Sequence, residues 1–312
     1  MKIGIIGANG EVGLGLTYWL KNNPRYHVVP IVRSRHTFSD PLTRICDLRN
    51  PSQINAALKG LDIIINLAGR IEGRDYEDFY IDNYICSVNL YKACRSNKVK
   101  HLIHFSSILT CTHPNSSYGK TKLLSDQYFI KQLSEGLPVL IIRPSWIITT
   151  SPKSLLHKFS SLIKVFPVLP VPKTGLFQPI FETTLYHFLQ DFIDNRRSYP
   201  KHKIIYGVGK DKMTLKNFFQ KLAVTLEKHR ILLEFPLSLL IEAVKLKNSI
   251  LPGAYVDLEK IRIQGDDRIH VETCPELEQH IKPIEEDLKK FFSNGGTSNQ
   301  LNKYEYNPGS TS

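Results

Sequence analysis

Cysteine is scarce in this chain, and its few copies are scattered. None of them has the close spacing of a metal-binding pair. We therefore expect no metal site, and the pattern fits a reduced, cytoplasmic compartment. The five positions are Cys46, Cys86, Cys94, Cys111 and Cys274.

Long apolar runs are also missing. No stretch approaches the roughly 20 apolar residues that a membrane-spanning helix needs. Met1 and Lys2 lead directly into a short apolar run, without a charged and then apolar leader that ends in a cleavage site. We therefore expect neither a transmembrane helix nor a signal peptide.

Basic residues are abundant, but they form no long basic block. The 312 residues include 41 Lys and Arg against 29 Asp and Glu, which gives a net charge of +12. Such a charge favours nucleic acid, anionic lipid or phosphorylated ligands as partners. Because the basic residues are spread along the chain, a solvated surface is the simpler explanation, and we expect no nucleic-acid partner. A phosphate-rich cofactor would account for a few of the charges.

The first thirteen residues, MKIGIIGANGEVG, combine an apolar run with regularly spaced glycines. The isoleucines predict a buried strand, and residues 14–20 continue as a helix. Gly7, Gly10 and Gly13 between them let the backbone turn tightly and approach a ligand, and free N–H groups at a helix N-terminus attract phosphate. The stretch predicts a phosphate-binding turn, with a plain strand–loop–helix connection as the alternative.

Strand and helix patterns alternate over the first 145 residues. The order predicts an α/β fold, a doubly wound parallel sheet of the Rossmann type, with ligands at the carboxyl ends of the strands. Further strands are predicted at Tyr26–Val32, Arg44–Leu48, Asp62–Leu67, Val99–Ser107 and Pro138–Ile142. Helices are predicted at Pro51–Leu58, Tyr76–Asn97 and Tyr118–Leu133.

The end of the second strand bears on the choice of cofactor. In a dinucleotide-binding fold this point faces the adenosine ribose, where an acidic residue suits NAD and an arginine suits the 2′-phosphate of NADP. Arg33 and Arg35 lie there, and the first acidic residue after them is Asp40. The pattern favours NADP(H) over NAD(H), although both arginines could simply be solvated.

Ser107, Tyr118 and Lys122 form the candidate catalytic group. The YxxxK spacing places Tyr118 and Lys122 on one face of a helix, where the ammonium would lower the pKa of the phenol and suit it to acid–base work. Ser107, at a strand end, can hydrogen-bond a substrate oxygen. The same spacing recurs at Tyr199 and Tyr206, but those copies straddle a late strand and lack a serine partner.

The composition changes after residue 145. Residues 146–181 are rich in proline, and we expect residues 146–292 to form a smaller, mostly helical substrate region. Residues 176–206 are expected to return to the first domain, and residues 293–312 to be disordered. Predicted elements are helices at Glu182–Asp194, Thr214–Lys228 and Pro275–Phe292 and a strand at Lys203–Tyr206; Leu232–Leu246 is either a packed helix or a surface for a membrane or partner.

As an ordered set, these motifs resemble the extended or atypical short-chain dehydrogenases/reductases, the NAD(P)-dependent epimerase/dehydratase superfamily. The resemblance covers roughly residues 1–195. It rests on the glycine turn, Asp47-Leu48, Asn66-Leu67-Ala68-Gly69, Asn83, His104-Phe105-Ser106-Ser107, Tyr118-Gly-Lys-Thr-Lys122, Arg143-Pro144-Ser145 and Gln178-Pro179-Ile180.

The resemblance implies a role for each matched residue. Asn83 would support the catalytic set of Ser107, Tyr118 and Lys122. The adenine would lie near Asp47 and Leu48. Residues implied in cofactor binding are Gly7, Asn9, Gly10, Glu11, Val12, Gly13, Arg33, Asp47, Leu48, Leu67, Ala68, Gly69, Tyr118, Lys122 and Pro144.

Some features depart from the sugar epimerases of the superfamily. The loop from Ser107 to Tyr118 is short and has Cys111-Thr112 where an aromatic-glycine pair is usual, and no glycine follows Ser145. The short loop and the stretch Phe166–Phe181 look more like the branch that contains the accessory nucleotide-binding subunit of respiratory complex I and its bacterial relatives. Some members of that branch bind NADP(H) without known turnover.

Two functions therefore remain open. The first is an NADP(H)-dependent oxidoreductase or epimerase that acts on a carbonyl or secondary alcohol of a small-molecule substrate. The second is a non-catalytic NADP(H)-binding protein, structural or regulatory, attached to a complex or a membrane surface. The intact Ser-Tyr-Lys set favours the first, whereas the short loop, the basic charge and the apolar stretch Leu232–Leu246 favour the second.

Overall fold

The computed structural model describes residues 1–34, 40–132, 136–152, 154–250, 256–269 and 273–293. Its centre is a seven-stranded parallel sheet in the order β10-β6-β5-β4-β1-β2-β3. The order reverses between β1 and β4, the position at which such sheets bind ligands. The strands are β1 (Lys2–Ile6), β2 (His27–Val32), β3 (Arg44–Ile45), β4 (Ile63–Asn66), β5 (His101–Phe105), β6 (Val139–Pro144) and β10 (His202–Gly207).

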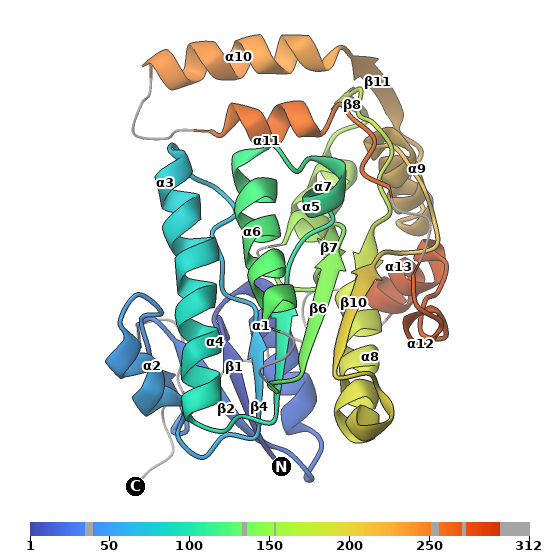
Figure 1. Cartoon of the computed structure of the whole chain (residues 1–312). Helices are drawn as coiled ribbons and strands as arrows, with labels where there is room; N and C mark the ends of the chain where they lie inside the picture. Colours follow the sequence, from blue (N-terminus) through green and yellow to red (C-terminus); the bar gives the residue numbers. More distant parts are fainter. Residues whose placement is uncertain (35–39, 133–135, 153, 251–255, 270–272, 294–312) are drawn as a thin grey trace, which may run out of the picture.

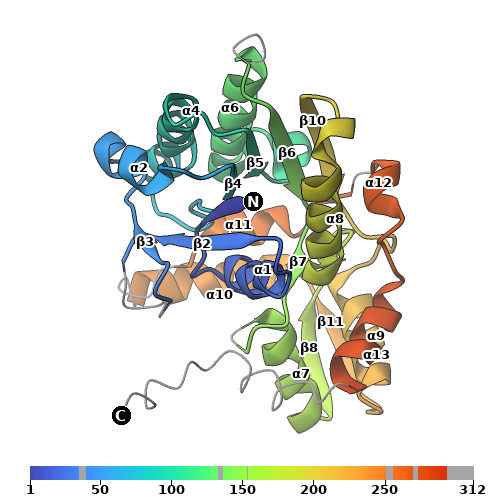
Figure 2. The same cartoon turned by 90° about the horizontal axis from the view of Figure 1, so that it is seen from below.

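Helices cover both faces of this sheet. One face carries α1 (Glu11–Lys21) and α8 (Glu182–Asn195), and the other carries α2 (Pro51–Leu58), α4 (Cys86–Ser96) and α6 (Ser117–Lys131) (Figure 2). Buried apolar side chains fill both layers, because alternate strand residues point to opposite faces. The prediction of a doubly wound parallel α/β sheet is confirmed.

Local sequence explains where several helices begin. Asn50 caps α2 by accepting hydrogen bonds from two backbone N–H groups, with Pro51 in the first turn. Ser116 caps α6 and Thr214 caps α9 (Leu215–Thr225), each by accepting one hydrogen bond from a backbone N–H group. Such caps contribute about 1 kcal/mol each to helix stability.

The predicted helix over residues 76–97 contains an irregular segment. It runs as α3 (Tyr76–Phe79), a π-helical segment η2 (Tyr80–Ile85) and then α4. The extra residue per turn rotates the side chains of the segment relative to the flanking helices. Such insertions are frequent at functional sites, and this one contains Asn83.

Some residues after 145 rejoin the main sheet and its helices, and others form a separate apolar cluster. The sequence predictions of a helix at Glu182–Asp194 and a strand at Lys203–Tyr206 agree with α8 and β10; α8 packs against α1, and β10 extends the main sheet. A separate apolar cluster is formed by residues of β7 (Ile147–Ile148), α7 (Leu155–Val165), β8 (Val168–Pro172), β9 (Ile180–Phe181), α9 and α13 (Ile284–Ser293), with β11 (Ile231–Phe235) packed against it. The other elements are α5 (Leu109–Thr112), η4 (Arg196–Ser198), α10 (Leu237–Ile250), α11 (Leu258–Ile263) and α12 (Pro275–Glu278).

Three sequence predictions need correction. The predicted strand Arg44–Leu48 ends at Ile45, because a turn follows. The single unit Leu232–Leu246 is a strand, β11, followed by a helix, α10, because Pro236 interrupts it. The single helix Pro275–Phe292 is two helices, α12 and α13, with Pro283 just before the second. Of the tail predicted to be disordered, Ser293 ends α13 and the rest lies outside the described residues.

The carboxyl edge of the sheet lies beneath two helices, α10 and α11 (Figure 1). The backbone N–H of Ser117, at the start of α6, donates a 2.9 Å hydrogen bond to Glu259 of α11. Lys260 of α11 also pairs with Glu72 in the loop after β4. This pair of helices is thus tied to the two segments that flank the carboxyl ends of β4 and β5. Among the described residues, no helix combines the length and the apolar character needed to cross a bilayer.

Candidate active site

The glycine turn forms a compact backbone surface at the end of β1. Gly7 adopts φ +79°, a conformation that favours glycine, and its N–H donates to Ile31 on β2. A Cβ atom on Gly7 would lie 3.0 Å from the backbone nitrogen of Ala68. The turn after β1 and the loop after β4, Leu67 and Ala68 included, therefore meet at the switch point.

The N-terminus of α1 is open for a phosphate. Gly10 is its N-cap residue, so no side chain caps the first N–H groups of the helix. Without such a cap, the backbone N–H groups of Glu11, Val12 and Gly13 suit an anionic ligand. A dinucleotide pyrophosphate fits this turn. The carboxylate of Glu11 accepts a 2.8 Å hydrogen bond from Thr149, and Asn9 is exposed beside it.

The residues expected near the adenosine lie at the ends of β2 and β3. Arg33 directly follows β2 and is exposed, whereas Arg35 lies outside the described residues. Asp47 begins a turn by accepting from the N–H of Arg49. Leu48, by contrast, is buried in the core between the sheet and α4, so its side chain packs there.

Asn83 joins three segments at the carboxyl edge. Its side chain accepts a 2.8 Å hydrogen bond from the N–H of Arg70 and donates to the carbonyl of Arg70 and to Thr121. A Cβ on Gly69 would lie 3.0 Å from Asn83 Oδ1 and 3.5 Å from Lys122 Nζ. The loop after β4, the π-helical segment and α6 therefore converge on one point.

Two of the three residues predicted to act together are in contact, and the third lies on the same helix as one of them. Ser107 and Tyr118 are joined by a side-chain hydrogen bond. Lys122 lies one turn beyond Tyr118 on α6 and donates a 2.6 Å hydrogen bond to the carbonyl of Phe105. Pro144, at the end of β6, accepts from the N–H of Ile108 and so holds the loop after Ser107.

Burial dominates the electrostatics of this group. It raises the pKa of Tyr118 to about 12, against the hydrogen bond from Ser107, which lowers it. It lowers the pKa of Lys122 to about 8, because the ammonium loses its hydration. The lowered pKa expected for Tyr118 is wrong, because burial outweighs the other influences on the phenol. Tyr118 is therefore a protonated phenol at neutral pH.

The two other YxxxK copies differ in structure. Tyr199 precedes β10, and Lys203 lies over its ring and pairs with Glu276. Tyr206 lies within β10. Of the three copies, the one at Tyr118 is helical, as the motif requires.

Sequence patterns alone did not reveal two further features of the site. Gly15 of α1 lies against Tyr186 of α8, whose hydroxyl donates to the carbonyl of Val12. A buried ion pair between Asp126 and Arg143 lies beside Ser106. Gly15, a glycine inside a helix, is a sequence signal of close packing. Asp126 gives no such signal, because a polar residue within a helix does not by itself indicate burial.

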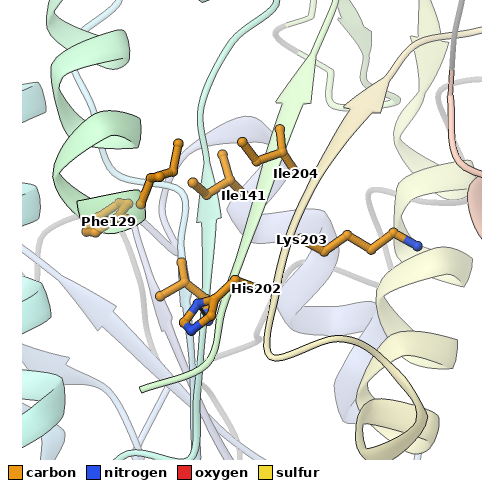
Figure 3. A pocket seen from close by; sticks show the side chains of 7 residues that line it. Phe129, Ile141, His202, Lys203 and Ile204 are labelled. Carbon is orange, nitrogen blue, oxygen red and sulfur yellow. Dashed lines mark hydrogen bonds between the residues drawn. The ribbon is translucent and has the colours of Figure 1, made fainter. Parts of the chain in front are cut away.

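An apolar hollow of about 210 Å³ lies elsewhere on the sheet (Figure 3). Its lining includes Val139 and His202, which are the first residues of β6 and β10, and Phe129 near the end of α6. It therefore lies toward the amino-terminal ends of these strands, away from Ser107 and Tyr118. The hollow is not part of the candidate site.

The sequence matches the profile of a known protein family. The profile of the NAD dependent epimerase/dehydratase family matches residues 3–166, more than half of the chain. The chain belongs to this family. It is thus an NAD(P)-binding protein of the oxidoreductase and epimerase type. Among curated protein sequences, none matches it.

Solved structures of epimerase/dehydratase enzymes share the fold at low sequence identity. A dTDP-4-dehydrorhamnose reductase from Bacillus anthracis, in complex with NADP, is 16% identical (TM-score 0.69; 94% of this chain and 99% of that chain). UDP-glucose 4-epimerase from Thermotoga maritima, with UDP-glucose, is 13% identical (TM-score 0.70; 95% and 99%). MoeE5, in complex with UDP-glucuronic acid and NAD, is 15% identical (TM-score 0.70; 95% and 100%).

Proposed function

We propose that this member of the epimerase/dehydratase family is an NADP(H)-dependent oxidoreductase or epimerase that acts on a carbonyl or secondary alcohol. The observation that carries the proposal is the contact between Ser107 and Tyr118 beside Lys122, at the sheet edge that also holds the glycine turn. In this proposal residues 1–145 bind the cofactor, and residues 146–292 shape the substrate pocket.

The geometry supports a simple division of labour. A bound nicotinamide would supply the hydride. Tyr118, protonated at neutral pH, would donate its proton to the substrate oxygen, and Ser107 would hydrogen-bond that oxygen. Lys122 would hold the ribose hydroxyls beside Gly69, and Asn83 would keep the loop that carries Gly69 in place.

The preference for NADP(H) rests on Arg33. It is exposed at the end of β2, where the adenosine ribose of a bound dinucleotide would lie, and no acidic side chain follows until Asp40. The carboxylate of Asp40 pairs with Lys21 of α1, so it does not present a free acceptor to the ribose. Structures that share the fold include complexes with NADP and with NAD.

One experiment tests the proposed function. The purified protein is analysed for bound nucleotide, and NADPH consumption is followed with a panel of ketones, aldehydes and nucleotide-linked keto sugars. We expect bound or tightly binding NADPH and turnover of at least one carbonyl class. Failure to bind any nicotinamide dinucleotide would contradict the proposal.

A second function is favoured by one surface feature. Leu239, Ala243, Leu246 and Ile250 recur at helical spacing on α10, and the three large side chains are 59%, 63% and 66% exposed. Such a stripe suits a protein that attaches to a complex or a membrane surface. The second candidate function is therefore a non-catalytic NADP(H)-binding protein, similar to the accessory subunit of complex I. Large exposed apolar patches commonly mark interaction sites.

The two functions differ in measurable ways. Tight NADPH binding without consumption in any panel reaction would favour the second. So would sedimentation with anionic phospholipid vesicles that is lost in the Leu239→Glu/Leu246→Glu variant. The matched control is Val224→Glu, which changes a still more exposed apolar side chain on α9. Turnover of a substrate without vesicle binding would favour the first function, that of an enzyme.

A further inference from the structure

A buried carboxyl group lies beside α1, at the start of α8. Glu182, the first residue of α8, is 3% exposed. Its Oε1 atom accepts hydrogen bonds of 2.7 Å from the backbone N–H of Thr150 and of 2.6 Å from the Thr150 hydroxyl. Within the described ranges of the chain, no Lys, Arg or His forms an ion pair with it. Glutamate is almost never fully buried without a paired cation, so the state of this carboxyl group needs another explanation.

The hydroxyl of Tyr186 lies between two hydrogen-bond acceptors. Its oxygen atom is 2.7 Å from Glu182 Oε2 and 2.9 Å from the carbonyl oxygen of Val12. A phenol carries one hydrogen, so Tyr186 can donate a full hydrogen bond to one of them. A backbone carbonyl has no hydrogen to give, whereas a carboxyl group can donate when it is protonated. Both contacts are satisfied together when Glu182 donates to Tyr186 and Tyr186 donates to Val12.

The surroundings of Glu182 favour the neutral carboxyl group. A Cβ atom on Gly15 would lie 2.3 Å from Tyr186 Oη and 3.2 Å from Glu182 Oε2, so glycine at this position permits the contact. The titratable groups that face Glu182 are Tyr186 on its own helix and Glu11 on α1. Burial raises the pKa of Glu182, against the hydrogen bonds from Thr150 and Tyr186, which lower it. The negative charge of Glu11 raises it further.

The contacts of Glu182 also join two parts of the chain. Thr150 follows β7, in the region proposed to shape the substrate pocket, and its neighbour Thr149 donates a 2.8 Å hydrogen bond to Glu11. Val12 lies in the first turn of α1, whose backbone N–H groups are proposed to bind the pyrophosphate. Glu182 thus lies where the substrate region contacts the glycine turn and α1.

We propose that Glu182 is a positioning residue for the glycine turn: it stays protonated at neutral pH and donates its hydrogen to Tyr186, which in turn holds the carbonyl of Val12. A neutral Glu182 also places no second negative charge beside Glu11, close to the proposed pyrophosphate. The purpose of this arrangement rests on the proposed function, because the pyrophosphate belongs to the bound cofactor. The contacts of Glu182 do not depend on it.

An ionised Glu182 makes a different prediction. It would accept the hydrogen of Tyr186, and the oxygen atoms of Tyr186 and Val12 would then face each other at 2.9 Å without a hydrogen between them. It would also be a buried charge without a cation, which is costly. The protonation of Glu182 is therefore the quantity to measure.

Infrared spectroscopy of the full chain without cofactor, at neutral pH, measures this protonation. A protonated carboxyl group has a carbonyl stretching band that is separate from the bands of a carboxylate and that shifts in heavy water. The difference spectrum between wild type and Glu182→Gln isolates the contribution of Glu182, and we expect the protonated band in it. Glu11→Gln is the matched control: Glu11 is exposed, so its difference spectrum should contain carboxylate bands.

Binding of NADPH tests the positioning role. Glutamine keeps the shape of a neutral Glu182 and can donate to Tyr186 while it accepts from Thr150. Glu182→Gln should therefore bind NADPH within about twofold of the wild type. Glu182→Ala removes the contacts that fix Tyr186 against Val12, and it should bind NADPH about tenfold more weakly in titration calorimetry.

Each outcome decides the inference. The protonated band at Glu182, with weaker NADPH binding in Glu182→Ala, supports it. A difference spectrum with carboxylate bands alone overturns it, as does unchanged binding in Glu182→Ala. If Glu182→Gln does not fold, Tyr186→Phe takes its place: the band should move to higher frequency when its acceptor is lost, and an unmoved spectrum overturns the inference. A wild type that fails to bind NADPH would contradict the proposed function, while the infrared band would still decide the protonation of Glu182.

Discussion

A Cβ atom on Gly13 would lie 2.2 Å from the carbonyl oxygen of Gly7. This close approach places the first turn of α1 against the turn after β1, where the pyrophosphate is proposed to bind. Gly13→Ala must push the helix away from the turn, at a cost of about 1–3 kcal/mol.

We therefore expect Gly13→Ala to weaken NADPH binding at least about tenfold, as measured by titration calorimetry. Gly10→Ala is a graded control, because its Cβ would lie 3.3 Å from the same carbonyl and needs a smaller adjustment. Equal affinities for NADPH in wild type and Gly13→Ala would show that the turn does not bind the cofactor.

Asn83→Ala should loosen the loop after β4. The change removes two hydrogen bonds to the backbone of Arg70 and one to Thr121, and it leaves half-buried backbone groups of Arg70 without this partner. We expect the free energy of unfolding to fall by about 1–3 kcal/mol, with weaker NADPH binding. Denaturant unfolding measures the first effect. Full stability in Asn83→Ala would contradict the role.

Arg33→Ala tests the choice of cofactor. Loss of a guanidinium beside the 2′-phosphate should weaken NADPH binding about tenfold or more and leave NADH binding nearly unchanged. Arg25→Ala is the matched control. Arg25 is also exposed, but it precedes the first residue of β2, at the opposite end of the strand from Arg33, and it pairs with Asp194. Similar losses for the two dinucleotides would refute the assignment to the 2′-phosphate.

His104 should make the free energy of unfolding depend on pH. Burial, together with the nearby Lys122, holds the pKa of His104 well below its ordinary value. A group with a lowered folded-state pKa contributes stability above the unfolded pKa, about 6.5, and this contribution is lost as the pH falls. The unfolding free energy of the wild type should therefore decrease between pH 7 and pH 5.

His104→Gln should show less of this decrease, because glutamine does not titrate and can still accept the hydrogen bond from Asn66. Thermal unfolding at the two pH values measures the difference, and His229→Gln, at an exposed position, serves as the control. A variant with the same acid sensitivity as the wild type would show that His104 is not its source.

Much of the sheet could be predicted because its strands carry local patterns. Residues 62–67 and 99–107 are apolar runs typical of strands buried on both faces, and β4 and β5 form within them. The π-helical segment could not be predicted, since one extra residue in a turn barely alters helical periodicity. The break at Pro236 could have been inferred from proline alone, but the apolar residues on both sides concealed it.

The candidate site was predictable where backbone geometry demands particular residues. Gly7 and Gly13 are required by a positive φ and by a close approach, so their spacing was informative. Asp126 and Arg143 were not predictable as a pair, because a polar residue on a helix or strand usually indicates solvent. The pKa of Tyr118 was predicted in the wrong direction, since burial cannot be read from the YxxxK spacing.

The most direct measurement of the central claim compares wild type with Tyr118→Phe in NADPH consumption, using the substrate found in the panel. The hydroxyl of Tyr118 is the proton donor proposed here, whereas the glycine turn holds the cofactor. The variant should bind NADPH with nearly the wild-type affinity and show turnover reduced at least about a hundredfold. Turnover by Tyr118→Phe at the wild-type rate would contradict the acid–base role and, with it, the proposed active site.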